Sequence, residues 1–151
     1  DLLYRANRTL RRRVIEGFFC TLAYVVFDFQ AGRAQIANSG LPYPLHFQAK
    51  TGRCLPLEVA GLPLGAFGDA TYEERTIELQ SGDVIVFHSD GGSEAWNGDE
   101  EYGTARLQEQ VERHAALSAP LLGDRLVGDV DRFLAGRPLR DDLTLVVVKI
   151  R

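Results

Sequence analysis

The sequence predicts an α+β fold in which two antiparallel β-sheets form a sandwich flanked by α-helices. Strand-like segments dominate the first ninety residues, two helical segments follow, and one more strand closes the chain. The segments 18–28, 84–88 and 143–150 are apolar on both faces, so an antiparallel sheet built from them needs cover on both sides. A second sheet on one side and helices on the other supply that cover.

The first segment, residues 1–13, is predicted to be the end of a helix because Leu2, Ala6 and Leu10 recur at helical spacing. Its other face is basic, and we interpret it as a solvated surface, with docking to an acidic partner as the alternative. The arginines on that face are Arg5, Arg8, Arg11, Arg12 and Arg13. Gly17 then breaks the helix.

Strands are predicted wherever apolar or alternating runs lie between turn residues. They are 18–28, a buried strand, with its hairpin partner 34–38, then 45–48, 54–58, 73–79, 84–88 and 143–150. Two helices, 103–114 and 118–134, are indicated by apolar residues at helical spacing, and Ser118 suits the N-cap of the second. With no linker or repeat between these segments, we expect one domain spanning residues 1–151.

The composition is that of an ordinary globular domain, with 45% hydrophobic and 25% charged residues. The formal net charge of −4 argues against a nucleic-acid partner, and no apolar run reaches membrane-spanning length. We therefore expect a cytoplasmic protein that binds neither nucleic acid nor membrane. Cys20 and Cys54 are too few for a disulfide framework and are predicted to be two buried thiols. The chain has no methionine and begins inside a helical pattern, so we expect it to be part of a longer protein.

Acidic residues adjoin two of the buried strands. Asp90 follows the strand 84–88, and Asp141 and Asp142 precede the strand 143–150. If these strands are antiparallel neighbours, the carboxylates meet at one end of the sheet, where like charges need compensation. A hard divalent cation such as Mg²⁺ or Mn²⁺ supplies it. The alternative is that these are turn residues, since Asp-Gly is common in turns.

Five motifs in order resemble the SpoIIE/RsbU branch of the protein phosphatase 2C-like superfamily of metal-dependent Ser/Thr phosphatases. They are Ala-Asn-Ser-Gly at 37–40 with prolines at 42 and 44, Gly-Leu-Pro-Leu-Gly at 61–65, the run 78–91 ending in Ser-Asp-Gly, Ser-Glu-Ala at 93–95, and Asp-Asp-Leu-Thr-Leu-Val at 141–146. The resemblance extends over essentially the whole chain and implies the C-terminal two-thirds of an αββα phosphatase domain.

The resemblance implies that Asp90 and Asp141 are metal ligands, with Asp142 and Gly91 as further candidates at the metal site. Members of the family use two Mn²⁺ or Mg²⁺ ions to activate a water that attacks phosphoserine or phosphothreonine. The implied substrate is a phosphorylated anti-sigma-factor antagonist, and the implied neighbour in the parent protein is an upstream sensory domain. A homodimer is also expected, because a sheet that lacks its first strands exposes an edge.

Two departures from the family pattern favour an alternative function. The family's N-terminal Asp-x-Ser-Gly-His-Gly-like motif, which supplies a further metal ligand, does not occur in this chain. Residues 38–41 read Asn-Ser-Gly-Leu where the family has Asn-Ala-Gly-His, so Leu41 replaces a histidine. The alternative is a degenerate, non-catalytic phosphatase fold kept as a regulatory or binding module.

The remaining polar candidates are interpreted individually. His46 and His114 are isolated and predicted to be surface residues, and His88, at the end of a core strand, is predicted to have its hydrogen bonds satisfied. Arg140 is expected either to contact a phosphate or to pair with its acidic neighbours.

Two aromatic residues flank the acidic stretch 99–101. We interpret Trp96 and Tyr102 as a small hydrophobic cluster under a solvated loop, with a substrate-facing flap as the alternative.

Overall fold

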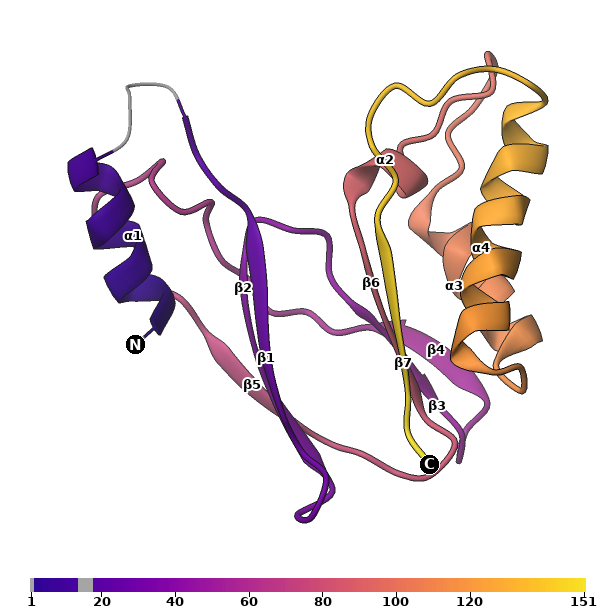
Figure 1. The fold of residues 1–151 in the computed structure, drawn as a ribbon, viewed down its shortest axis with the longest axis horizontal. Helices are drawn as coiled ribbons and strands as arrows, with labels where there is room; N and C mark the ends of the chain where they lie inside the picture. Colours follow the sequence, from indigo (N-terminus) through magenta and orange to yellow (C-terminus); the bar gives the residue numbers. More distant parts are fainter. Residues whose placement is uncertain (1, 14–17) are drawn as a thin grey trace. The chain divides into compact units, whose positions relative to one another are not determined.

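The computed structural model describes residues 2–13 and 18–151 (Figure 1). Their contacts group into two compact units, Asp1–Leu41 with Glu58–Leu79 and Pro42–Leu57 with Gln80–Arg151. The predicted breaker Gly17 lies outside the described residues. That residues 1–151 form a single domain stays a prediction.

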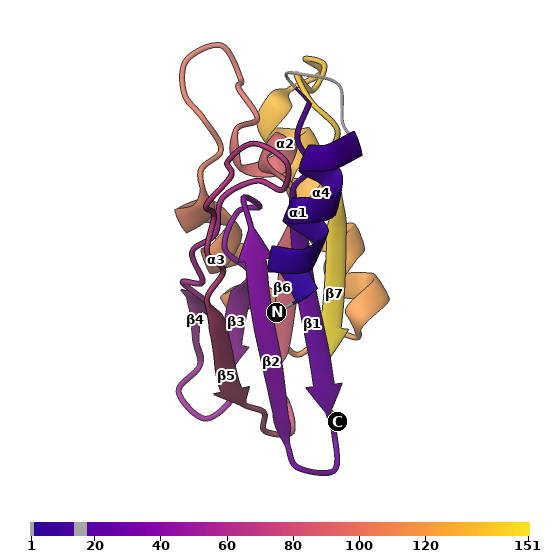
Figure 2. The same ribbon diagram turned by 90° about the vertical axis from the view of Figure 1, so that its left-hand side faces the viewer.

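The first unit contains a three-stranded antiparallel sheet in the order β1-β2-β5 (Figure 2). The strands are β1 (Leu22–Asp28), β2 (Arg33–Ser39) and β5 (Glu74–Glu78). The first half of the central strand alternates: Ala34 and Ile36 are fully buried, while Arg33 and Gln35 are exposed. This period of two is the pattern of a strand with one buried face.

Helix α1 (Leu2–Arg13) belongs to the same unit and is fixed by one buried asparagine. The Asn7 side chain is fully buried, donates to the Phe67 carbonyl at 2.9 Å and accepts from the Gly65 amide at 2.7 Å. It therefore joins the helix to the predicted turn at 61–65. The basic face carries the exposed residues Arg5, Arg8, Arg11 and Arg12, as predicted for a solvated surface.

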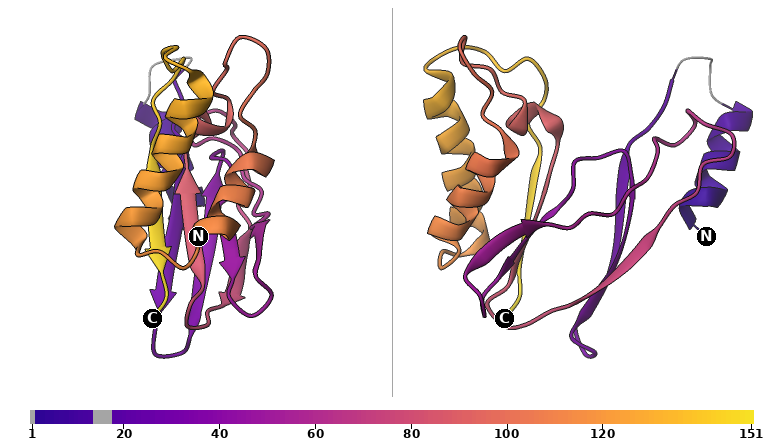
Figure 3. Two further views of the ribbon diagram at one scale, coloured as in Figure 1. Left: turned by 90° about the vertical axis from the view of Figure 1, so that its right-hand side faces the viewer. Right: turned by 180° about the vertical axis from the view of Figure 1, so that it is seen from behind.

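The second unit is a four-stranded antiparallel sheet in the order β4-β3-β6-β7, with helices α3 and α4 on one face (Figure 3). Its elements are β3 (Leu45–Gln48), β4 (Arg53–Pro56), β6 (Val84–His88), α2 (Asp90–Ser93), α3 (Thr104–His114), α4 (Ala119–Leu134) and β7 (Leu145–Lys149). Two valines of β6 pack against the helices in a core of fully buried side chains. The core contains Val84 and Val86 of β6, Val111 of α3, and Leu122 and Leu126 of α4. This is the core that supports the end of β6.

The predicted fold class is confirmed: the chain forms two antiparallel sheets accompanied by helices. None of the helices formed by residues 2–13 and 18–151 combines the length and the apolar character that crossing a bilayer requires.

Two local predictions are corrected. The strand predicted to begin at residue 18 begins at Leu22, and Phe18 and Phe19 lie outside it, 67% and 64% exposed. Moreover, β1 is not buried on both faces, because Tyr24 and its alternate neighbours are exposed. Ser118 does occupy the N-cap of α4, but its side chain makes no capping hydrogen bond.

The two thiols differ, although both were predicted to be buried. Cys20 is exposed, whereas Cys54 is 2% exposed, and its backbone is held by α3. The Cys54 amide donates to Glu112 Oε1 at 2.8 Å, and Gln108 Nε2 donates to the Cys54 carbonyl at 2.9 Å. Burial, reinforced by the charge of Glu112, raises the pKa of the Cys54 thiol to about 12.

We expect a thiol reagent at pH 8 to modify Cys20 rapidly and Cys54 only as fast as the chain unfolds. The pKa of the Cys54 thiol is higher in the folded than in the unfolded chain. The neutral buried thiol therefore contributes fully to the free energy of unfolding at any pH below the unfolded pKa. That contribution is lost as pH rises towards about 12. Counting modified thiols against time, with Cys20→Ser as the control, tests this; two fast thiols in the wild type would contradict it.

Candidate metal centre

The two strands that carry the acidic residues are antiparallel neighbours. Pairing runs from Val84 opposite Lys149 to His88 opposite Leu145, so the end of β6 meets the start of β7. This confirms the condition under which Asp90 and Asp141 were expected to share one end of the sheet. Figure 1 shows α2 and the segment leading into β7 at that end.

Ser89 ties the two acidic segments together beyond the last paired residues. Its amide donates to the Thr144 carbonyl at 3.0 Å, and the Thr144 amide donates to Ser89 Oγ at 2.9 Å. The same hydroxyl donates to the Asp142 carbonyl at 2.8 Å. The backbone on either side of the site is therefore fixed by hydrogen bonds of one residue, Ser89.

Asp90 opens the four-residue helix α2, an element that the sequence pattern does not predict. The Asp90 carbonyl accepts from the Glu94 amide at 2.8 Å and from Ser93 Oγ at 3.2 Å. Gly91 is buried against the opposite segment: a Cβ there would lie 2.5 Å from the Asp142 carbonyl oxygen. Glycine thus allows α2 to approach the segment that leads into β7.

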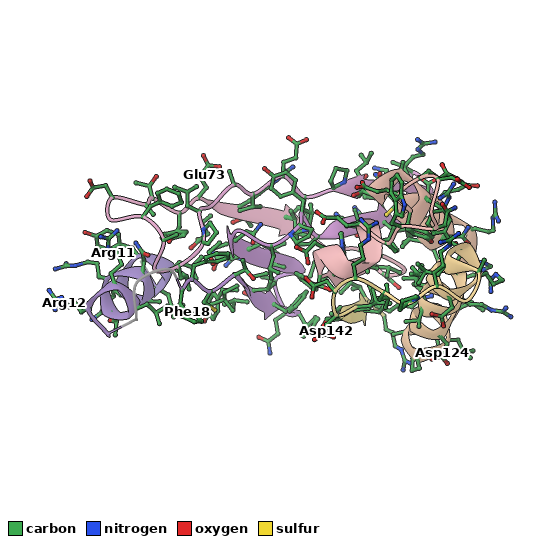
Figure 4. The ribbon with its side chains drawn as sticks, turned by 90° about the horizontal axis from the view of Figure 1, so that it is seen from above. Arg11, Arg12, Phe18, Glu73, Asp124 and Asp142 are labelled. Atoms are coloured by element: carbon green, nitrogen blue, oxygen red, sulfur yellow. The ribbon has the colours of Figure 1, made fainter. Side chains whose placement is uncertain are left out.

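The carboxylates of Asp90, Asp141 and Asp142 are exposed, and Figure 4 shows Asp142 beside α2. The Asp142 amide donates to Asp141 Oδ1 at 2.7 Å, which orients that carboxylate. Across the described ranges 2–13 and 18–151, no three or more His, Cys, Asp or Glu residues are grouped so as to hold a metal ion. A pair of exposed carboxylates nonetheless suits Mg²⁺, which keeps several waters and is often bound through one or two carboxylates.

His88 lies directly before this site and is 4% exposed. Its Nδ1 is 3.1 Å from the Ser89 carbonyl oxygen, but Nε2 has no partner among the described residues, so the prediction of satisfied hydrogen bonds is wrong for that atom. Burial lowers the pKa of His88, against the opposite effect of the Ser89 carbonyl.

His46 is not the surface residue that was predicted. It is 4% exposed, and its Nε2 lies 3.0 Å from Asp83 Oδ2, which is equally buried. Asp83 directly precedes β6, so this pair stands at the opposite end of that strand from Asp90. His114, by contrast, is half-buried at the end of α3.

Trp96 and Tyr102 enclose a small loop that follows α2. Tyr102 is buried, donates from its hydroxyl to Asp129 Oδ2 at 2.7 Å and packs edge-to-face on Phe133, as expected for a hydrophobic cluster. Arg140 makes no ion pair with its acidic neighbours among the described residues. Its guanidinium lies instead over the Trp96 ring, 5.6 Å from the centroid.

Two antiparallel sheets with helices, and acidic residues at the ends of paired strands, agree with the arrangement expected from the resemblance to phosphatase 2C-like proteins. The family described as Stage II sporulation protein E (SpoIIE) matches residues 1–151, and the chain belongs to that family.

One similar protein is the phosphoserine phosphatase RsbU of Bacillus subtilis (strain 168). It is 27% identical over 149 residues, which cover 99% of this chain and 44% of that protein. The chain thus spans less than half the length of this relative.

Solved structures share the fold. The SiaA-PP2C domain of Pseudomonas aeruginosa matches with a TM-score of 0.84 at 17% identity, over 99% of this chain and 60% of that one. The phosphatase domain of SpoIIE from Bacillus subtilis (Mn presoaked) matches with a TM-score of 0.76 at 19% identity, over 98% and 64%. The RsbU and RsbW domains of Rv1364c from Mycobacterium tuberculosis match with a TM-score of 0.73 at 28% identity, over 96% and 40%.

Proposed function

We propose that this chain belongs to a metal-dependent phosphatase that hydrolyses phosphoserine or phosphothreonine on a protein, with Asp90 and Asp141 as metal ligands. The observation that carries the proposal is the β6–β7 pairing, extended by Ser89, which brings both acidic segments to one end of the sheet. The similarity to a phosphoserine phosphatase supports the reaction.

The carboxylates fit the proposed role by their chemistry. Both are exposed hard oxygen donors, and Asp141 uses Oδ1 to accept the Asp142 amide, so its Oδ2 remains available to a ligand. Mn²⁺ or Mg²⁺, two ions in a complete site, would supply a nucleophile at neutral pH and offset charge on the phosphoryl oxygens. Asp142 and Gly91 are further candidates at the metal site, ranked behind Asp90 and Asp141.

The substrate we propose is a phosphorylated anti-sigma-factor antagonist in the bacterial cytoplasm. This rests on two relatives: one is named RsbU, and the other joins RsbU and RsbW domains in one chain. An upstream sensory domain and a homodimer stay predictions.

We expect Asp90→Asn and Asp141→Asn each to abolish Mn²⁺ binding measured by calorimetry, because each removes one anionic ligand. Metal-dependent hydrolysis of a phosphoserine protein should fall at least about 100-fold, as removal of an essential ligand predicts. The circular dichroism spectrum and unfolding midpoint should change little, since both side chains are exposed.

The matched control is Asp124→Asn, which neutralises an exposed carboxylate on α4 away from the site (Figure 4). It should bind Mn²⁺ like the wild type. Unaltered turnover in the Asp90→Asn, Asp141→Asn double variant would reject the assignment. Metal binding without any hydrolysis by the parent protein would favour the regulatory-module alternative.

A further inference from the structure

Two arginines that precede Asp141 lie against the loop that follows α2. The guanidinium of Arg140 lies over the Trp96 ring, and that of Arg137 lies against Gly98, where a Cβ would come 2.8 Å from its Cζ. Trp96 pairs with Glu101 in an isolated antiparallel bridge, so residues 96–101 form a small hairpin. The hairpin follows the helix that begins with Asp90, and the two arginines precede Asp141. The contact between hairpin and arginines therefore joins the two segments that carry the carboxylates.

The hairpin is anchored at both ends. The Tyr102 amide donates to the Ala95 carbonyl at 2.8 Å, and the Gly103 amide donates to the Ser93 carbonyl at 2.8 Å, which fixes the hairpin to α2. Tyr102 itself is buried and bonded to α4 through Asp129. Trp96 is therefore a fixed platform for the arginine beside it.

The contact leaves the hydrogen-bond donors of Arg140 unused. The residue is exposed, and it forms no hydrogen bond or ion pair with any part of the chain that the structure describes, although Asp141 and Asp142 follow it directly. Stacking on an aromatic ring occupies the face of a guanidinium but leaves its in-plane N–H groups free. Those groups match two oxygens of a phosphate in a bidentate pair.

We propose that Arg140, held on Trp96, binds the phosphate of the phosphomonoester substrate next to the Asp90–Asp141 carboxylates. The inference rests on the proposed function and deepens it by naming a substrate-binding residue. Arg140 and Asp141 are adjacent in a bend, so their Cα atoms are about 3.8 Å apart. This closeness along the chain, together with the stacking of Arg140 on the hairpin that follows α2, supports Arg140 as the contact for a phosphoryl group held at Asp90 and Asp141.

Trp96 is the only tryptophan of the chain and makes the proposal testable without turnover. We expect inorganic phosphate, added with saturating Mn²⁺, to change Trp96 fluorescence saturably. In Arg140→Ala, the Kd for phosphate measured by calorimetry should rise about tenfold or more, as loss of one charged hydrogen-bonding pair predicts. Arg140→Lys should give an intermediate Kd, because lysine keeps the charge but not the bidentate geometry.

Kinetics separate substrate binding from a merely structural contact. With a phosphoserine peptide, Arg140→Ala should raise KM about tenfold while kcat stays within about twofold. Arg125→Ala, which removes an exposed arginine of α4, is the matched control and should change neither constant.

The outcomes distinguish the proposal that Arg140 binds phosphate from the proposal that the protein is a phosphatase. An unchanged Kd for phosphate in Arg140→Ala, or no response of Trp96 in the wild type, overturns the role of Arg140, while normal metal-dependent turnover would leave the phosphatase proposal standing. Phosphate binding that depends on Arg140 in a protein with no turnover would support the binding site and reject the proposed reaction.

Discussion

Replacing Asp83 by alanine is expected to lower the free energy of unfolding by about 3 kcal/mol, because the variant leaves buried donors without an acceptor. Asp83 is 3% exposed and accepts three hydrogen bonds: Oδ2 lies 3.0 Å from His46 Nε2 and 3.1 Å from the Gln80 amide, and Oδ1 lies 2.9 Å from the Ala49 amide. One side chain thus joins β3, the turn after β3 and the turn before β6. Urea unfolding followed by circular dichroism measures the loss.

A double-mutant cycle separates the His46–Asp83 pair from the backbone contacts. His46→Ala and the double variant, measured beside Asp83→Ala, should give a coupling energy of about 1–3 kcal/mol. Asp124→Ala removes an exposed carboxylate of α4 and should change stability by less than about 0.5 kcal/mol. If Asp83→Ala were no more destabilising than Asp124→Ala, the buried pair would not stabilise this unit.

The elements of the core were predictable where the sequence is uniformly apolar and bounded by turn residues. The strand 84–88 has the limits that the sequence predicts, because Ser-Gly-Asp precedes it and Ser-Asp-Gly follows it. The strand predicted from residue 18 begins later because Phe18 and Phe19 have strand-like side chains but lie outside the sheet. Residue type alone does not separate an exposed aromatic residue from a buried one.

Of the candidate site, the sequence predicts only the carboxylates. Asp90 and Asp141 were identified because each adjoins a core strand, and the pairing of β6 with β7 confirms that geometry. The partner of His46 was missed, since Asp83 is 37 residues away in sequence and is brought near by the β3–β6 pairing. The stacking of Arg140 on Trp96 was missed for the same reason: it depends on long-range contacts that leave no periodic signal.

The glycine pair of α2 gives the second large effect. Alanine normally stabilises a helical position relative to glycine by up to about 1 kcal/mol. At Gly91, however, the new Cβ would lie 2.5 Å from the Asp142 carbonyl oxygen and 2.9 Å from that of Asp141. Both are backbone atoms, and the Asp142 carbonyl is held by Ser89 Oγ, so α2 and the segment before β7 must separate. We expect Gly91→Ala to cost about 2 kcal/mol of stability, as overpacking of a close contact predicts.

The separation should also weaken Mn²⁺ binding by at least about tenfold, because ligands held on two segments must keep their relative positions to within a fraction of an ångström. Calorimetric titration and urea unfolding of Gly91→Ala measure both losses. Gly92→Ala is the matched control: its Cβ would meet only Leu143 Cδ1, the end of a flexible side chain, at 2.6 Å. It should repack with little change in stability or Mn²⁺ affinity. Equal losses in the two variants would mean that α2 tolerates no side chain at all, and that the close approach of Gly91 does not itself set the metal site.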